Sequence, residues 1–340
     1  MALPWGSWSG LRASGCPMST RPQTTPGSGR IALGLLAVTM LAAVVTMATA
    51  TPVHAGSWVH ENGSVSLATT PKRVVALNWA ATEALLLLGV TPIGIADRDG
   101  YSHWVQEPAL PEGVHNVGSR TAPSLEAIAE LKPDLIVTSS EMSPAGNLLN
   151  RIAPTYVISV YKEGHDPYRQ ARHMLRTLGD MLGQTARAEA VIADVEQTLA
   201  TQRSRLERAG HSGDDIALVS FLDPRHVRIN TPNGMLDTAI EALGLNNVWP
   251  YDGNFWGFSV IGLDALAPYR DARLVVISPT LPGLADSLAN SPFWSYLPPV
   301  RNRQVYQVDP VWTFGGLYPV KRLALLLTDA LLAGGSNHVR

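Results

Sequence analysis

Cysteine and charged residues are scarce in this sequence. Among 340 residues there is one cysteine, Cys16, and Asp, Glu, Lys and Arg together make up 16%. A lone cysteine excludes a disulfide framework and a cysteine-based metal site within one chain. The formal net charge of −2 lacks the basic excess that is typical of nucleic-acid-binding proteins, so we expect no nucleic-acid partner.

The motifs of several enzyme classes are also missing. The sequence has no G-x-G-x-x-G or G-x-x-x-x-G-K-[ST] loop to cradle phosphates, and Ser259 lacks the G-x-S-x-G turn of hydrolases. The nine histidines show neither H-x-H nor H-E-x-x-H spacing. Asp97 and Asp99 follow a predicted strand, where Asp is an ordinary turn residue. We therefore predict a protein that is not an enzyme and supplies no metal ligands of its own.

The first 55 residues have the pattern of an export signal. Residues 31–50 form an uncharged, mostly apolar run, three arginines precede it, and no acidic residue occurs before Glu61. A basic start, an apolar middle and a small-residue exit are typical of a secretory signal peptide. We predict cleavage before Gly56; the alternative is a retained membrane anchor, because a run of this length can span a bilayer. Met18 is an alternative start of the chain.

Cleavage would change the composition of the protein. Removal of 55 residues leaves 285; three of the 26 basic residues and none of the 28 acidic ones are lost, so the net charge becomes −5. No later segment approaches the length of a membrane span. We therefore expect a mildly acidic, cysteine-free protein that is exported.

The remaining chain repeats one pattern in its two halves. Residues 124–139 and 262–278 each combine a short amphipathic segment, a turn and an apolar β-branched run, typical of a helix that leads into a buried parallel strand. Residues 81–90 and 235–245 are helix-like stretches that follow apolar strands. The length of the chain and its 46% hydrophobic residues provide for two packed domains. We predict an α/β fold with two lobes, each built on a mostly parallel sheet.

A helical segment separates the two halves. Residues 166–208 are nearly all strong helix formers, Pro167 suits a first helical turn, and Gly183 suits a break between two helices. Two lobes joined by a stiff helix should move little relative to each other, with a ligand cleft between them. The predicted N-terminal lobe, long rigid connecting helix and C-terminal lobe are residues 56–163, 164–183 and 184–340.

Candidate ligand-binding residues follow from this repeat. In open α/β sheets, ligands bind beyond the carboxyl ends of the strands. Arg120 directly precedes the first repeated helix, Trp256 precedes the second, and Trp104 and Trp312 lie in other loops that follow predicted strands. Each tryptophan taken alone is more often a packing residue. Together with one arginine they predict a cleft with flat apolar walls and a fixed donor for an anionic oxygen.

Six segments carry a resemblance to a known family. They are RVVALNW (73–79), VQEPALP (105–111), VGSRTAPSLEAIAELKPDLIV (117–137), LDPRHVRI (222–229), GNFWG (253–257) and PVWTFGG (310–316). Their combination resembles the helix-linked (class III) periplasmic substrate-binding proteins of ABC importers, and among them the ferric hydroxamate, or ferrichrome-type, siderophore-binding proteins. The resemblance covers essentially the whole mature chain. It implies a monomer that captures an Fe(III)–siderophore complex, holds no permanent cofactor, and delivers the complex to an inner-membrane ABC permease with its cytoplasmic ATPase.

The resemblance also implies roles for individual residues. Arg120 matches the arginine that bonds the hydroxamate oxygens around the ferric ion. Two positions depart from the family: Met142 stands in place of a tyrosine that joins this arginine, and Phe314 replaces a second tyrosine. The loss of two hydroxyls favours a siderophore other than ferrichrome. The remaining matches are three aromatic walls and two supporting positions: Trp256, Trp104, Trp312, Asn254 and Trp79.

Members of this superfamily dock on their permease with one surface carboxylate from each lobe. The resemblance places Asp264 at the position in the C-terminal lobe. The counterpart in the N-terminal lobe falls on Asn147, so that contact is either absent or moved to Glu141. Because surface ion pairs are individually weak, docking can survive the loss of one.

Two other functions remain open at this point. A binding protein for another bulky cofactor, haem or cobalamin, would keep the same fold. An exported siderophore-modifying enzyme is less favoured, because no nucleophile–base pair can be named.

Overall fold

The computed structural model describes residues 55–140 and 146–339, so the predicted export signal lies outside it. Within these ranges no helix is long and apolar enough to cross a bilayer. The described chain begins with an antiparallel hairpin of β1 (Gly56–His60) and β2 (Gly63–Leu67). Trp58 anchors this hairpin, because its indole Nε1 donates a 2.8 Å hydrogen bond to Asp180 Oδ2.

The N-terminal sheet is entirely parallel and is flanked by short helices. Its strands are, in spatial order, β5 (His115–Asn116), β4 (Gly94–Ile95), β3 (Val74–Ala76), β6 (Leu135–Thr138) and β7 (Thr155–Val157). β3 and β6 are buried at every residue, as expected of parallel strands that are covered on both faces. The helical elements are α1 (Trp79–Leu87), α2 (Arg98–Gly100), the π-turn η1 (Tyr101–Val105), α3 (Leu125–Glu130) and α4 (Gly146–Ile152).

The C-terminal sheet is mixed. Its strand order is β11 (Phe258–Gly262), β9 (His226–Asn230), β8 (Asp215–Phe221), β12 (Arg273–Ile277) and β13 (Val305–Val308), and β10 (Asn246–Asn247) also pairs with β8. β8, β10, β12 and β13 run parallel, whereas β9 and β11 are antiparallel to their neighbours. The helices are α7 (Asp237–Ala242), the 3-10 turn η3 (Leu263–Leu266), α8 (Leu284–Ala289), α9 (Pro292–Tyr296), α10 (Pro298–Arg301) and α11 (Tyr318–Ala333). The predicted two-lobe α/β fold with mostly parallel sheets is confirmed, with this antiparallel edge as a difference.

The repeated pattern is present in both lobes but is not identical. Gly89 and Gly244 lie just after α1 and α7 with φ near +78° and +74°, so each ends its helix in the left-handed region where glycine is favoured. Strand β9 lies between β8 and α7, and the sequence analysis did not predict this additional strand. The second repeated segment forms only the 3-10 turn η3, because Pro268 two residues later has no N–H with which to continue a helix.

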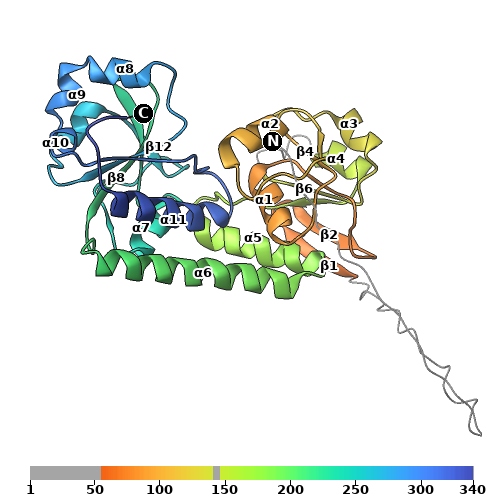
Figure 1. Cartoon of the computed structure of the whole chain (residues 1–340). Helices are drawn as coiled ribbons and strands as arrows, with labels where there is room; N and C mark the ends of the chain where they lie inside the picture. The colour runs from red at the N-terminus through yellow and green to blue at the C-terminus, as the bar shows by residue number, and fades with distance from the viewer. Residues whose placement is uncertain (1–54, 141–145, 340) are drawn as a thin grey trace, which may run out of the picture. The chain divides into compact units, whose positions relative to one another are not determined.

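Two antiparallel helices connect the lobes: α5 (Pro167–Met181) and α6 (Thr185–Arg208). Gly183, with φ +65°, forms the turn between them, and the Arg176 guanidinium donates to both oxygens of Glu189 at 2.7 and 3.0 Å. α5 packs on α1, whereas the longer α6 packs on α5, α7 and α11 (Figure 1). The predicted connecting segment 164–183 thus contains α5, and the helix that reaches the C-terminal lobe is α6. The lobe boundaries themselves remain a prediction.

Residues 310–322 make a second connection between the lobes. The buried carboxylate of Glu83 on α1 accepts hydrogen bonds from the backbone N–H groups of Tyr318 at 2.8 Å and Gly316 at 3.2 Å. Arg322 pairs with Glu107, with Nη1 and Oε1 2.7 Å apart. The lobes are thus joined both by α5 and α6 and by this segment, which fits the expected small relative motion.

Candidate functional site

A turn that is stabilised by hydrogen bonds among its own residues positions Arg120 at the end of the N-terminal sheet. Gly118 follows β5 with φ +100°, and its N–H donates to Asn116 Oδ1 at 3.1 Å. The Ser119 hydroxyl accepts from the N–H of Ala122 at 2.9 Å. A side chain at Gly118 would be strained in this conformation, so glycine is required for the turn that presents Arg120.

The guanidinium of Arg120 lies over a buried indole. Its Cζ is 3.8 Å from the centroid of the Trp79 ring and 5.4 Å from that of Trp312. Trp79 is only 3% exposed, and its Nε1 donates to the carbonyl of Asp97 at 3.1 Å, so the ring cannot rotate away. A cation over an indole is stabilised by about 0.5–2 kcal/mol, depending on how far it is desolvated.

Asp97 fixes the other edge of Arg120. Arg120 Nε donates to Asp97 Oδ2 at 3.3 Å, and both side chains are a little over one third exposed. Such an exposed pair adds at most about 1 kcal/mol to stability. Asp97 also accepts from Gly100 N–H at 3.3 Å, which is the turn role predicted for it. Among the described residues only Nε has a hydrogen-bond partner, so both Nη groups remain for an incoming acceptor.

Aromatic rings continue from Arg120 across to the other lobe. The centroid of Trp312 is 4.6 Å from that of Trp79 and 5.1 Å from that of Phe314. Phe314 in turn lies 5.6 Å from Trp256. Most of these pairs meet edge to face, the arrangement that the ring quadrupoles favour. The result is a rigid aromatic wall that begins at the arginine.

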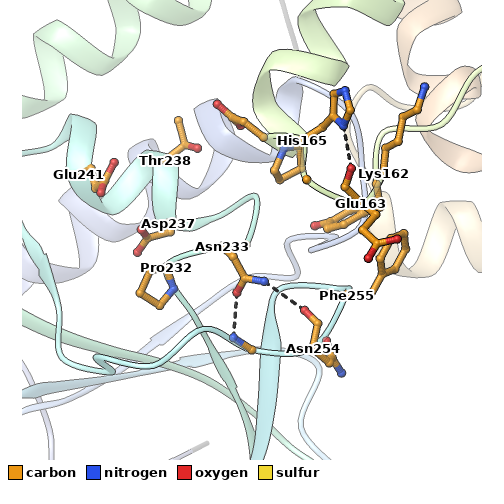
Figure 2. A pocket seen from close by; sticks show the side chains of 16 residues that line it. Lys162, Glu163, His165, Pro232, Asn233, Asp237, Thr238, Glu241, Asn254 and Phe255 are labelled. Atoms are coloured by element: carbon orange, nitrogen blue, oxygen red, sulfur yellow. Dashed lines mark hydrogen bonds between the residues drawn. The ribbon is translucent and has the colours of Figure 1, made fainter.

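A tight turn aims Trp256 at this wall. The side-chain oxygen of Asn254 accepts from the backbone N–H of Trp256 at 2.9 Å, which closes the turn. Gly257 has φ +72°, and a Cβ there would come within 2.2 Å of Gly234 Cα. Asn233 braces the turn from outside, since its Nδ2 donates to the carbonyl of Asn254 at 3.2 Å (Figure 2). Asn254 therefore positions Trp256 through the backbone.

The arginine and the aromatic wall enclose a cavity of about 460 Å³. This volume is within the range of pockets that take small organic ligands. We call it the central cavity. Its described lining is largely apolar, with two guanidinium groups and a few hydroxyl and amide groups, and consists of Asn78, Trp79, Ala80, Arg120, Ser139, Ile158, Ser159, Val160, Tyr161, Arg228, Trp256, Phe258, Trp312 and Phe314.

The structure brings most of the predicted site residues together. Arg120, Trp79, Trp256, Trp312 and Phe314 all line the central cavity, although their roles in binding remain a prediction.

Two predicted residues, Trp104 and Asn254, do not line the central cavity as it is described, and a third cannot be placed. Trp104 is 40% exposed, and among the described residues of the aromatic wall its ring contacts Trp312, with ring centroids 6.3 Å apart. Asn254 lines a different cavity. Met142 lies outside the described residues.

The predicted docking residues lie on the surface where they are described. Asn147 on α4 and Asp264 on η3 are both exposed. The Asp264 carboxylate lies close over Gly262, since a Cβ at that glycine would come within 2.3 Å of its Oδ1. Glu141 lies outside the described residues. The docking role of all three stays a prediction.

Sequence reasoning missed Tyr161, Arg228 and Phe258. Tyr161 lies in the loop after β7, and its hydroxyl donates to the carbonyl of Thr313 at 2.7 Å, while its ring lies 5.4 Å from Trp256. Burial raises the pKa of this hydroxyl, which stays protonated. Phe258 stands two residues after Trp256, and the polar–apolar alternation of β9 marks Arg228 as facing away from the core. Phe258 and Arg228 could therefore have been found from the sequence pattern, whereas Tyr161 could not.

A second cavity of about 500 Å³ shares Tyr161 with the central cavity. In Figure 2, Lys162, Glu163 and His165 of the loop before α5 lie on the opposite side of this cavity from Asp237 and Glu241 of α7. Burial raises the pKa of Asp237 to about 6. Carboxylates outnumber cationic groups in this lining, in contrast to the central cavity.

The described residues offer no cluster that resembles a metal site. In 55–140 and 146–339, no three His, Cys, Asp or Glu side chains are placed to hold a metal ion. His103 packs against Trp104 with ring centroids 5.0 Å apart, and His165 Nδ1 lies 2.8 Å from the carbonyl of Glu163. What the arrangement offers is flat apolar surface and guanidinium donors, suited to a large, partly apolar ligand that carries anionic oxygens.

Comparison with known proteins gives results consistent with this arrangement. The sequence model described as periplasmic binding protein matches residues 74–311. The iron(3+)-hydroxamate-binding protein FhuD of Escherichia coli is 33% identical over 270 residues, which are 79% of this chain and 90% of that protein. The Fe(3+) dicitrate-binding periplasmic protein FecB of Escherichia coli is 28% identical and covers 78% of this chain and 86% of its own length.

Solved structures show the same fold. Vibrio cholerae FhuD, with Fe3+–Desferal bound, superposes with a TM-score of 0.74 at 29% identity, over 78% of this chain and 99% of that chain. Staphylococcus aureus SirA superposes with a TM-score of 0.61 at 23% identity, over 82% of this chain and 98% of its own, which shows the fold alone.

Proposed function

This chain belongs to the periplasmic binding protein family, and on that basis we propose that it captures a ferric hydroxamate-type siderophore in the periplasm and delivers it to an inner-membrane ABC importer. In this role the chain would leave the bound complex chemically unchanged, so iron would leave the chelator elsewhere. The recognised species is the ferric complex, with the iron already wrapped in its organic ligand.

One observation carries the choice of ligand: Arg120 is clamped on Trp79 with both Nη groups directed to no described partner, at the edge of a cavity walled by aromatic rings. Hydroxamate oxygens around Fe(III) carry negative charge, and a guanidinium donates to them through charge-assisted hydrogen bonds. One such bond contributes about 1.5–3 kcal/mol, so burial of the siderophore backbone on the indole rings must supply most of the affinity.

The experiment is equilibrium dialysis of purified protein against ferrichrome and ferrioxamine B with radioactive iron. Arg120→Ala and Trp256→Ala should each weaken binding at least about tenfold, because each removes an anchor worth 1.4 kcal/mol or more. Tyr296→Ala is the control, since this 74% exposed aromatic on α9 lies outside the described lining of the cavity. Unchanged affinity in both site variants, with folding shown by circular dichroism, would refute the site.

Docking on the permease is the second part of the proposal. Exposed Asp264 would supply the contact from the C-terminal lobe, and the N-terminal lobe would contribute Glu141 or do without a carboxylate at Asn147. In cells whose siderophore uptake depends on this protein, Asp264→Lys should reduce uptake while binding of the ferric complex stays unchanged. Uptake equal to that of the unaltered protein would refute the docking role.

A further inference from the structure

A second arginine in the central cavity has no assigned role. Arg228 lies on β9, where burial alternates so that Val227 and Ile229 face the core and Arg228 faces away from it. It joins Trp256 and Phe258 in the lining of the cavity. It therefore comes from the C-terminal lobe, whereas Arg120 comes from the N-terminal lobe.

The Arg228 guanidinium lies over an aromatic ring and is not neutralised by a described carboxylate. Its Cζ lies 5.0 Å from the centroid of the Phe258 ring, a cation–π contact that favours one orientation of the side chain. Among the described residues no carboxylate pairs with it and no acceptor bonds to it. Arg120, in contrast, pairs with Asp97.

The described lining of the central cavity contains two arginines and no Asp or Glu. Since Asp97 offsets one of the two charges, Arg228 leaves an uncompensated positive charge beside an apolar wall. The second cavity has the opposite character, with Glu163, Asp237 and Glu241 in its lining (Figure 2). An anionic part of a ligand in this cleft would accordingly be directed toward Arg228 and away from the second cavity.

We propose that Arg228 binds a carboxylate carried by the siderophore, so that the preferred ligand is a ferric hydroxamate complex with a free carboxylate on its periphery. The inference rests on the proposed function and adds the ligand class to it. A guanidinium matches a carboxylate with two parallel N–H···O bonds, which gives both affinity and orientation. Arg120 would contact the oxygens around the iron, and Arg228 the periphery of the complex.

The test compares one complex in two forms. The ligand is a ferric citrate-based dihydroxamate with free terminal carboxylates, and the matched ligand is the same complex with those carboxylates methyl-esterified. Esterification should weaken binding to the unaltered protein about tenfold, the factor that corresponds to 1.4 kcal/mol for one exposed charge-assisted contact. In Arg228→Gln the two forms should bind equally well, at the level of the ester on the unaltered protein.

Two controls separate this inference from the proposed function. Arg225→Gln alters an exposed arginine three residues away, outside the described lining of the cavity, and should retain the full effect of esterification. Ferrichrome, which has no carboxylate, should bind Arg228→Gln as it binds the unaltered protein. If ferrichrome binds but esterification has no effect, or if Arg228→Gln weakens all ligands alike, the role of Arg228 is refuted and the proposed function stands. If no ferric hydroxamate binds the unaltered protein, the proposed function fails and the inference falls with it.

Discussion

The buried carboxyl of Glu83 should make the stability of this protein depend on pH. Glu83 is fully buried on α1, and its oxygens accept from the N–H groups of Tyr318 and Gly316, which belong to the segment that joins the lobes. Burial raises the pKa of Glu83 from 4.5 to about 7, against the lowering effect of these hydrogen bonds. The folded protein thus retains a proton that the unfolded chain releases between pH 4.5 and 7.

The sign and size of the effect follow from this difference. Because the folded state binds more protons, the contribution of Glu83 to the free energy of unfolding is fully present below pH 4.5 and is lost as the pH rises through 7. A pKa difference of about 2.5 units corresponds to roughly 3 kcal/mol in total, of which about 2 kcal/mol is lost between pH 5 and pH 7.5. Asp237, whose pKa burial raises to about 6, adds a fall of the same sign at lower pH.

The assay is urea unfolding followed by tryptophan fluorescence at pH 5 and pH 7.5, for the unaltered protein and Glu83→Gln. The amide cannot titrate, so the difference in the free energy of unfolding between pH 5 and pH 7.5 should be about 2 kcal/mol smaller in the variant than in the unaltered protein. Glu126→Gln, which alters an exposed carboxyl on α3, should keep the full difference. Equal pH dependence in the unaltered protein and Glu83→Gln would refute the reasoning.

Three further predictions concern the site. Gly257→Ala should lower the free energy of unfolding by about 1–3 kcal/mol, because φ +72° and the 2.2 Å approach to Gly234 forbid a Cβ; an unchanged urea midpoint would contradict this. Tyr161→Phe should lower the free energy of unfolding by about 1 kcal/mol, because it removes the hydrogen bond to the Thr313 carbonyl, and should leave ligand affinity unchanged. Urea unfolding measures the first effect and dialysis the second. A loss of affinity would show that the hydroxyl contacts the ligand. Arg120→Lys should bind ferric hydroxamates more weakly than the unaltered protein and more tightly than Arg120→Ala, because lysine keeps the charge but lacks the planar guanidinium that lies over Trp79. Equal affinity of Arg120→Lys and the unaltered protein in dialysis would contradict a role of this contact.

Much of the fold could be predicted because local sequence determines it. Ser124 caps α3 by accepting from the N–H of Ala127 at 3.1 Å, and Pro167 and Gly183 bound α5 and its turn. The mixed edge of the C-terminal sheet could not be predicted, because the short alternating run of β9 specifies a half-exposed strand but not its direction. The hairpin β1–β2 was also missed, since its anchor, Trp58 to Asp180, joins residues 122 positions apart.

The lining of the central cavity could likewise be predicted only where local sequence determines the position of a residue. Loop tryptophans and Arg120 follow from strand-exit positions and from the resemblance to known binding proteins. Tyr161 enters the cavity only because the loop after β7 folds back on Thr313, a contact that no local pattern encodes. Asn254 was predicted to support ligand binding, but it is not part of the described lining of the central cavity. Its side chain instead accepts a hydrogen bond from the N–H of Trp256 and closes the turn that carries this tryptophan.

The central claim is that the aromatic cavity binds a ferric hydroxamate. The most direct measurement is tryptophan fluorescence of the protein during titration with a ferric hydroxamate, a ferric catecholate, ferric citrate, haem and cobalamin. Trp79, Trp256 and Trp312 line the cavity, so a bound ferric complex should quench them. We predict saturable quenching by the ferric hydroxamate at lower concentration than by any other ligand. Saturation by haem or cobalamin instead, or no saturation by any of the five, would contradict the claim.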